Sequence, residues 1–118
     1  MTTQEIANRL VELCRQGDYP TCYQELFSPN AKSIEPNENF GPPVTEGMDN
    51  ILKKGELFQS MVEEMHGGTI GDPIVAGNHF SCVMTMDWTL KGQPRRQEEE
   101  ICVYKVEDGK IVSEQFFY

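Results

Sequence analysis

The chain has 118 residues, of which 38% are hydrophobic, and it carries a formal net charge of -9. This length suits one domain with its own core, and we expect a single domain over residues 1–118. The excess of acidic residues repels phosphate backbones and anionic lipid surfaces, so we expect neither nucleic acid nor a membrane surface as a partner. The N-terminus lacks a signal-peptide core, and nowhere do about 18 apolar residues run together. We therefore expect a soluble cytoplasmic protein.

The cysteines show no metal-ligand spacing. Cys14, Cys22, Cys82 and Cys102 stand among apolar residues without a CxxC pattern, and no histidine is spaced beside them as a second ligand would be. This pattern predicts buried thiols in a reducing compartment, and no metal site is expected.

The first part of the chain predicts two helices. Thr2 and Glu5 match a capping box, and apolar residues then recur at helical spacing until Gly17 ends the segment. Asp18 can cap a second, shorter helix with Pro20 in its first turn.

A short run of small and β-branched residues, 31–34, ends at Glu35, which stands directly before Pro36. Proline has no N–H and forces its predecessor into an extended backbone, so Glu35 should lie at a strand end. It is either a solvated strand end or a carboxylate at the rim or floor of a pocket. The following "PNENFGPP" predicts a loop.

The longest helix is expected to begin at Thr45, with an apolar side that extends to Met65. His66 would stand at its end, as a helix cap or a catalytic group. From Gly67 the hydrophobic period changes to two, and turns at "AGNH", "LKGQPRR" and "VEDGK" predict about four antiparallel strands. Helices followed by an antiparallel meander indicate an α+β fold.

Alternation along the predicted strands sorts their two faces. One inward set comprises Phe80, Cys82, Met84, Met86 and Trp88, and on the next strand another set comprises Glu98, Glu100, Cys102 and Tyr104. The opposite face of that next strand also carries apolar residues, Ile101 and Val103. A second copy of the chain would cover them, so we expect a homodimer through the sheet.

The order of these elements, ending in "VYKVEDGKIVSEQFFY", resembles the SnoaL-like branch of the nuclear transport factor 2 and ketosteroid isomerase superfamily over essentially the whole chain. The resemblance implies a cone-shaped fold in which three N-terminal helices pack on a curved antiparallel sheet. SnoaL-like cyclases work as acid and base catalysts without metal or organic cofactor, so none is expected here.

In the steroid isomerases of this superfamily, an aspartate immediately before a proline moves the proton. Glu35 before Pro36 falls at that position, which implies a general base or acid. The isomerases also use a tyrosine on the first helix and a carboxylic acid on the penultimate strand, and these positions hold Leu10 and Cys102 here. Leucine cannot donate a hydrogen bond and a thiol donates weakly, so the known steroid isomerisation is not expected.

The first functional hypothesis is a ligand binder or cofactor-free enzyme whose cavity takes a mostly apolar carbonyl compound. Glu35 would transfer the proton in an isomerisation, cyclisation or dehydration, with Glu100 and His66 as further catalytic candidates. Glu100 could instead be a solvated or structural residue paired with Arg95 or Arg96. The candidate ligand-binding residues are Met84, Met86, Trp88, Cys102, Tyr104, Phe116 and Tyr118.

The second hypothesis is a non-catalytic dimeric module. Side chains would then fill the pocket, and the outer surface of the sheet would bind a partner. An open cavity of ligand size distinguishes the first hypothesis from the second.

Overall fold

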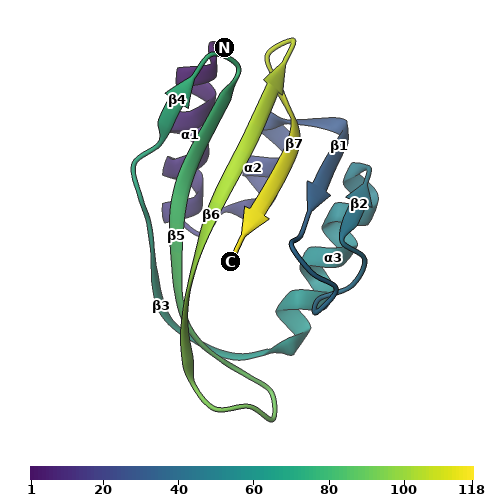
Figure 1. Cartoon of the computed structure of the whole chain (residues 1–118), viewed down its shortest axis with the longest axis vertical. Helices are drawn as coiled ribbons and strands as arrows, with labels where there is room; N and C mark the ends of the chain where they lie inside the picture. The colour runs from purple at the N-terminus through teal and green to yellow at the C-terminus, as the bar shows by residue number, and fades with distance from the viewer.

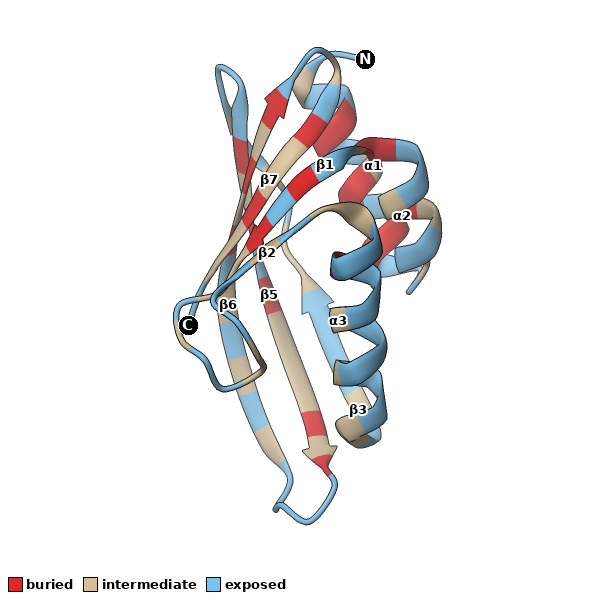
Figure 2. Ribbon diagram, turned by 90° about the vertical axis from the view of Figure 1, so that its right-hand side faces the viewer, coloured by how far each residue is buried: buried red, intermediate tan, exposed pale blue.

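The computed structural model describes residues 1–118 as three helices and seven strands, and all three helices lie on one side of a curved sheet (Figures 1 and 2). The α+β expectation is confirmed. The elements are α1 (Thr3–Arg15), α2 (Tyr19–Leu26), β1 (Phe27–Ile34), β2 (Val44–Glu46), α3 (Met48–Met61), β3 (Val62–Ile70), β4 (Ile74–Ala76), β5 (His79–Leu90), β6 (Arg96–Glu107) and β7 (Lys110–Phe117). None of the helices combines the length and hydrophobicity needed to cross a membrane.

The strands follow the order β2-β1-β7-β6-β5-β3, with β4 paired to β5. All neighbouring strands are antiparallel except β1 and β7, which run parallel with Ile34 opposite Gln115. The sheet is therefore mixed at this one pairing. It places Glu35, which follows β1, beside the C-terminal residue Tyr118.

The two N-terminal helices begin where their caps predict. The Thr2 hydroxyl accepts a hydrogen bond from the Glu5 amide at 3.1 Å, and the Glu5 carboxylate accepts one from the Thr2 amide at 2.9 Å. Asp18 caps α2 through the Thr21 amide at 3.2 Å. Gly17 follows the end of α1 with a φ of +72°, a conformation that glycine adopts without strain. These expectations are confirmed.

The third helix is shorter than its apolar pattern predicts. It begins at Met48 and ends at Met61, and the next residues form β3 against β5. Starting the helix at Thr45, which lies in β2, and placing Met65 and His66 in the helix are therefore both wrong. Pairing with β5 overrides the local helical pattern here, and Gly68 suits it because an added Cβ would lie 2.5 Å from the Thr85 carbonyl oxygen.

The core is concentrated under α1 and α2. Helix α1 buries six residues, whereas α3 buries only Ile51. In Figure 2 most buried segments lie in α1, α2 and the strand halves beside them, and Trp88 and Leu90 are buried at the far end of β5. All four cysteines are buried free thiols, as predicted. The half of the sheet that faces α3 is covered less tightly, and the cavity described next lies there.

Candidate functional site

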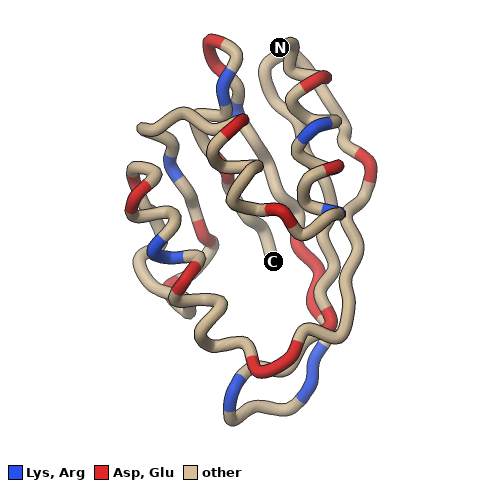
Figure 3. The backbone as a smooth tube through the Cα atoms, turned by 180° about the vertical axis from the view of Figure 1, so that it is seen from behind, with Lys and Arg blue, Asp and Glu red and all other residues tan.

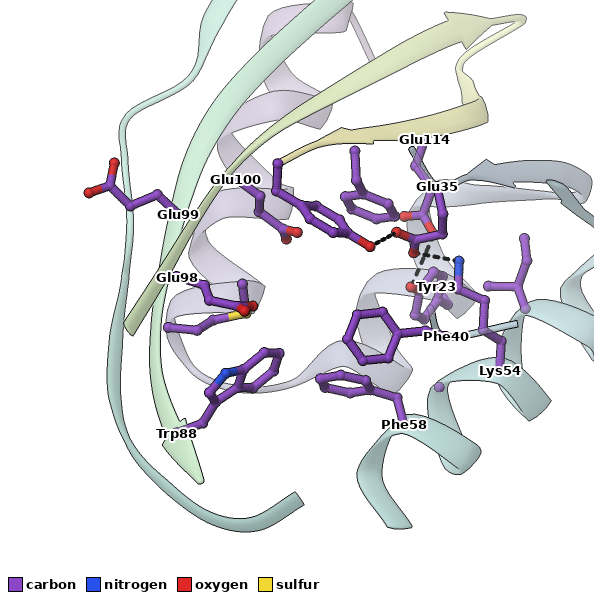
Figure 4. A pocket seen from close by; sticks show the side chains of 15 residues that line it. Tyr23, Glu35, Phe40, Lys54, Phe58, Trp88, Glu98, Glu99, Glu100 and Glu114 are labelled. Atoms are coloured by element: carbon purple, nitrogen blue, oxygen red, sulfur yellow. Dashed lines mark hydrogen bonds and ion pairs between the residues drawn. The ribbon is translucent and has the colours of Figure 1, made fainter. Parts of the chain in front are cut away.

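A cavity of about 180 Å³ lies between α3 and the adjoining half of the sheet (Figure 4). Its apolar lining consists of Phe40, Ile51, Gly55, Phe58, Met86, Trp88 and Phe116. The polar side chains that face it are Tyr23, Glu35, Lys54, Glu98, Glu100, Glu114 and Tyr118, whereas Glu99 borders it with its side chain turned away (Figure 4). A mostly apolar pocket with a few convergent polar groups is typical of small-molecule sites.

Glu35 accepts two donors at one end of the cavity. Its Oε1 lies 2.8 Å from Lys54 Nζ, and the Tyr118 hydroxyl donates to Oε2 at 2.8 Å. The Glu35 amide donates to the Pro43 carbonyl at 2.7 Å, which brings the intervening loop back against the strand end. Only 13% of the Glu35 side chain is exposed, so it is not a solvated strand end.

A second carboxyl group, Glu114, lies deeper beside this pair. The Tyr23 hydroxyl donates to Glu114 Oε1 at 3.4 Å, and Lys54 Nζ donates to Ser33 Oγ at 2.8 Å. Burial raises the pKa of Glu114 to about 7, although hydrogen bonding by Ser33 and the charge of Lys54 oppose the increase. Lys54 thus links the neighbourhoods of both carboxyl groups.

The acidic run of β6 divides between the two faces of the sheet. Figure 3 shows this run beside the basic residues of the β5–β6 turn. Because strand side chains alternate, Glu98 and Glu100 point into the cavity, whereas the Glu99 side chain points away from it (Figure 4). Burial raises the pKa of Glu100 to about 7, and its Oε1 accepts a weak hydrogen bond from Cys102 Sγ at 3.5 Å.

The two arginines of the turn pair with other carboxylates than Glu100. Arg95 bonds Asp87 at 2.7 Å, and Arg96 Nε lies 3.0 Å from Glu98 Oε1. The expectation that either arginine neutralises Glu100 is therefore not met.

Aromatic rings form a further wall of the cavity. The Phe58 ring centre lies 5.6 Å from that of Phe40 and 4.9 Å from that of Trp88. Trp88 is 2% exposed. This wall gives a flat apolar ligand a large contact area.

The structure brings six of the ten candidate residues to the cavity: Glu35, Met86, Trp88, Glu100, Phe116 and Tyr118. Met84, Cys102 and Tyr104 face the same side of the sheet but belong to the core cluster under α1 and α2. The Tyr104 ring stacks on Phe80 with centres 4.7 Å apart. His66 lies on β3, where its Nε2 is 2.8 Å from Thr89 Oγ1, and it does not line the cavity.

Several lining residues were not selected from the sequence. Glu98 alternates with Glu100, and Glu114 alternates with Phe116, so the strand period could have indicated both. Phe58 belongs to the apolar side of α3. Lys54 and Phe40 carry no local signal, because the first stands on a helix surface and the second in a loop.

The polar groups of the cavity are suited to proton transfer. No three His, Cys, Asp or Glu side chains are grouped as metal ligands would be. Glu35 is held by an ammonium and a hydroxyl group, whereas burial raises the pKa of Glu100 to about 7 and favours its protonated form. One carboxylate can accept a proton while the other donates one.

Comparison with known proteins supports the expected family and fold. A family model described as a SnoaL-like domain matches residues 1–118. A structure from Mesorhizobium loti, whose description proposes a SnoaL-like polyketide cyclase and a carbohydrate phosphatase, is 33% identical over 100% of both chains with a TM-score of 0.93. No curated protein matches the chain.

More distant solved structures share the fold alone. A nuclear transport factor 2-like protein of unknown function from Burkholderia pseudomallei is 16% identical, covers 100% of this chain and 92% of its own, and has a TM-score of 0.80. A structure from Bacillus subtilis whose description proposes an isomerase is 16% identical over 98% of this chain and 88% of its own, with a TM-score of 0.76. The predicted cone-shaped fold is confirmed.

Proposed function

Because the chain belongs to the family of SnoaL-like domains, we propose that its cavity binds a small, mostly apolar carbonyl compound and that Glu35 transfers a proton on it. One observation carries the proposal: the Glu35 carboxylate lines the same largely aromatic cavity as Glu100, whose pKa is raised to about 7. Such a pair supplies a base and an acid without a cofactor.

In this reaction Glu35 removes a proton from the carbon next to the carbonyl group. The C–H bond breaks, an O–H bond forms on Glu35, and the electron pair moves toward the carbonyl oxygen. Glu100 in its protonated form donates to that oxygen or to a leaving hydroxyl group. Return of the proton at another carbon gives an isomer, and loss of water gives a dehydrated product. Lys54 and Tyr118 orient Glu35 through their 2.8 Å contacts.

The environment of Leu10 and Cys102 supports chemistry other than the steroid isomerase reaction. Leu10 is 1% exposed and Cys102 is 0% exposed, and neither lines the cavity. The relative from Mesorhizobium loti, at 33% identity, is described as a proposed cyclase. Cyclisation and isomerisation both begin with proton removal beside a carbonyl group, so that description is consistent with a role for Glu35.

Exchange of α-protons tests the proposal before a natural substrate is identified. We expect the protein to accelerate exchange of the 1-indanone α-protons in D2O, followed by NMR. Glu35→Gln should lower the rate about 100-fold or more while leaving binding of 1-indanone within about twofold. Glu99→Gln makes the same charge change on an outward side chain and should keep the wild-type rate. A wild-type protein that binds 1-indanone without accelerating exchange, or an equally fast Glu35→Gln variant, would contradict this role.

We also propose that the outer face of the sheet forms a homodimer. Val83, Ile101 and Phe117 lie opposite one another on β5, β6 and β7, and they are 46%, 49% and 47% exposed. A continuous apolar row across three strands is the kind of surface that a second copy covers. Light scattering at micromolar concentration should report a dimer, and Ile101→Glu should give a monomer.

A matched control for the dimer is Ile74→Glu. Ile74 is 74% exposed on β4 and lies outside the row, so this variant should remain dimeric. A monomeric wild-type protein would rule out the interface. A non-catalytic dimeric module shares this prediction, and the two functions differ in whether the cavity binds and turns over a carbonyl compound.

A further inference from the structure

Trp88 carries an unsatisfied hydrogen-bond donor at the wall of the cavity. It is the one tryptophan of the chain, it is 2% exposed, and its indole Nε1 is buried without a hydrogen-bond partner. An indole nitrogen can donate but cannot accept. Buried donors without acceptors are rare in native proteins because the lost hydration is not recovered. Trp88 also lines the cavity, so a ligand that shifts the side chains covering Nε1 can supply the missing acceptor.

The side chains around the indole restrict which ligand group can act as that acceptor. In Figure 4 the nitrogen edge of Trp88 faces the side of the cavity that carries Glu98, and the other edge of the ring faces Phe58. Glu98 Oε1 lies 3.0 Å from Arg96 Nε, yet this pair lacks hydrogen-bond alignment, so Arg96 Nε is also unsatisfied. The Arg96 guanidinium carbon lies 6.0 Å from the Trp88 ring centre.

Three kinds of ligand group can be compared at this position. A carboxylate could accept from Trp88, but it would add a negative charge to a cavity whose acidic side chains already outnumber the cations Lys54 and Arg96 beside it. An ammonium group would be attracted by these carboxylates but cannot accept a hydrogen bond. A hydroxyl group can accept from the indole and donate its own proton to Glu98, so it satisfies both neighbours.

We propose that Trp88 positions the ligand by donating its indole N–H to a ligand hydroxyl group, which in turn donates to Glu98. This inference rests on the proposed function, since it assumes that the cavity holds the ligand. Glu35 and Trp88 lie on different sides of the cavity (Figure 4). The substrate class is therefore a hydroxylated carbonyl compound, with its hydroxyl group at Trp88 and its reacting carbon nearer Glu35.

A matched set of four probes tests the choice of group: indane, 5-indanol, indane-5-carboxylate and 2-aminoindane. We expect 5-indanol to bind roughly tenfold more tightly than indane at pH 7, and indane-5-carboxylate to bind more weakly than indane. Titration calorimetry gives the affinities. Because the chain has a single tryptophan, its indole N–H gives one cross-peak in a ¹⁵N-labelled sample. That peak should move downfield with 5-indanol and not with indane.

Two variants distinguish the effect of the Trp88 hydrogen bond on binding from the effect of the shape of the aromatic wall. Trp88→Phe keeps an aromatic ring without the N–H, and it should reduce the preference for 5-indanol over indane to less than about twofold. Phe58→Leu alters the neighbouring ring and should weaken both probes equally while preserving the preference. If Trp88→Phe does not fold, the shift of the wild-type indole peak still decides the question.

The remaining outcomes distinguish this inference from the proposed function. Equal affinity for indane and 5-indanol, or a preference that survives in Trp88→Phe, overturns the role of Trp88 while the cavity remains a binding site. Tightest binding of 2-aminoindane overturns it in favour of a cation site. Failure of all four probes to bind contradicts the ligand cavity itself, and with it both proposals.

Discussion

The inward face of strands β5 and β6 belongs to the hydrophobic core at one end and lines the cavity at the other. Under α1 and α2, Phe80 and Tyr104 are buried, and their rings stack within the main core. Toward α3, the same strands present Trp88 and Glu100 to an open cavity. Helix α1 buries six residues against the sheet and α3 buries only one. The covering helix, rather than the alternation of the strands, decides which part of the face becomes core and which becomes cavity.

The largest expected effect follows from this contrast in packing. Leu10→Ala removes a side chain that is 1% exposed at the closed end, and it should lower the free energy of unfolding by about 2 to 5 kcal/mol. Phe58→Ala removes a larger side chain at the cavity, where part of the space is already empty. It should therefore lower the free energy of unfolding clearly less than Leu10→Ala does. Urea unfolding of both variants measures the difference. Equal losses would mean that the end near α3 is packed as tightly as the core.

The next effect concerns pH and Glu114, which is 3% exposed. Its pKa is raised from 4.5 to about 7 in the folded protein, so the folded state binds more protons than the unfolded state between these values. The free energy of unfolding should therefore fall as the pH rises from about 4 to about 8, by about 3 kcal/mol from this group. Well below pH 4.5 the effect is absent, because both states are protonated.

Two variants check the assignment of this pH dependence. Glu114→Gln should remove about half of the decrease, because glutamine does not ionise, whereas Glu100, whose pKa is also raised to about 7, still does. Urea unfolding at pH 5 and pH 8 measures the decrease. Glu99→Gln, on the outward face, should retain the wild-type decrease. A decrease in Glu114→Gln as large as that of the wild-type protein would show that Glu114 does not contribute to it.

A smaller effect is expected at Lys54, whose side chain is 19% exposed beside a Glu35 side chain that is 13% exposed. Lys54→Met leaves Glu35 without its cation and should lower the free energy of unfolding by about 2 kcal/mol at pH 8, between the values for buried and surface pairs. Adding Glu35→Gln should recover part of the loss. Lys32→Met breaks the exposed pair with Glu46 and should cost less than about 0.5 kcal/mol. An equal loss of unfolding free energy in Lys54→Met and Lys32→Met would contradict the conclusion that the Lys54–Glu35 pair is enclosed.

Local signals predicted much of the fold. The capping box at Thr2 and Glu5, the Asp18 cap and the turns between β5, β6 and β7 each depend on neighbours in the sequence, and all were found. The first half of strand β3, before Gly67, was missed because Met65 continues the helical spacing, while its pairing with β5 is a long-range contact. No pattern within a few residues records such a contact.

The candidate site was predicted only as a face of the sheet. Met84 and Met86 share that face, but one belongs to the core and the other to the cavity, because α1 and α3 cover different lengths of β5. Lys54 reaches Glu35 and Ser33 from a separate element, and nothing in its local sequence indicates that meeting. Alternation gives the direction of a side chain, whereas its depth depends on the packed helices.

The most direct test of the central claim maps where an apolar probe binds. Indane is titrated into ¹⁵N-labelled protein with assigned backbone amides. We expect saturable shifts at Lys54, Phe58, Trp88 and Glu100, and unchanged signals around Leu10 and Phe80. The absence of saturable shifts, or shifts confined to the outer face at Val83 and Ile101, would contradict a ligand cavity between α3 and the sheet.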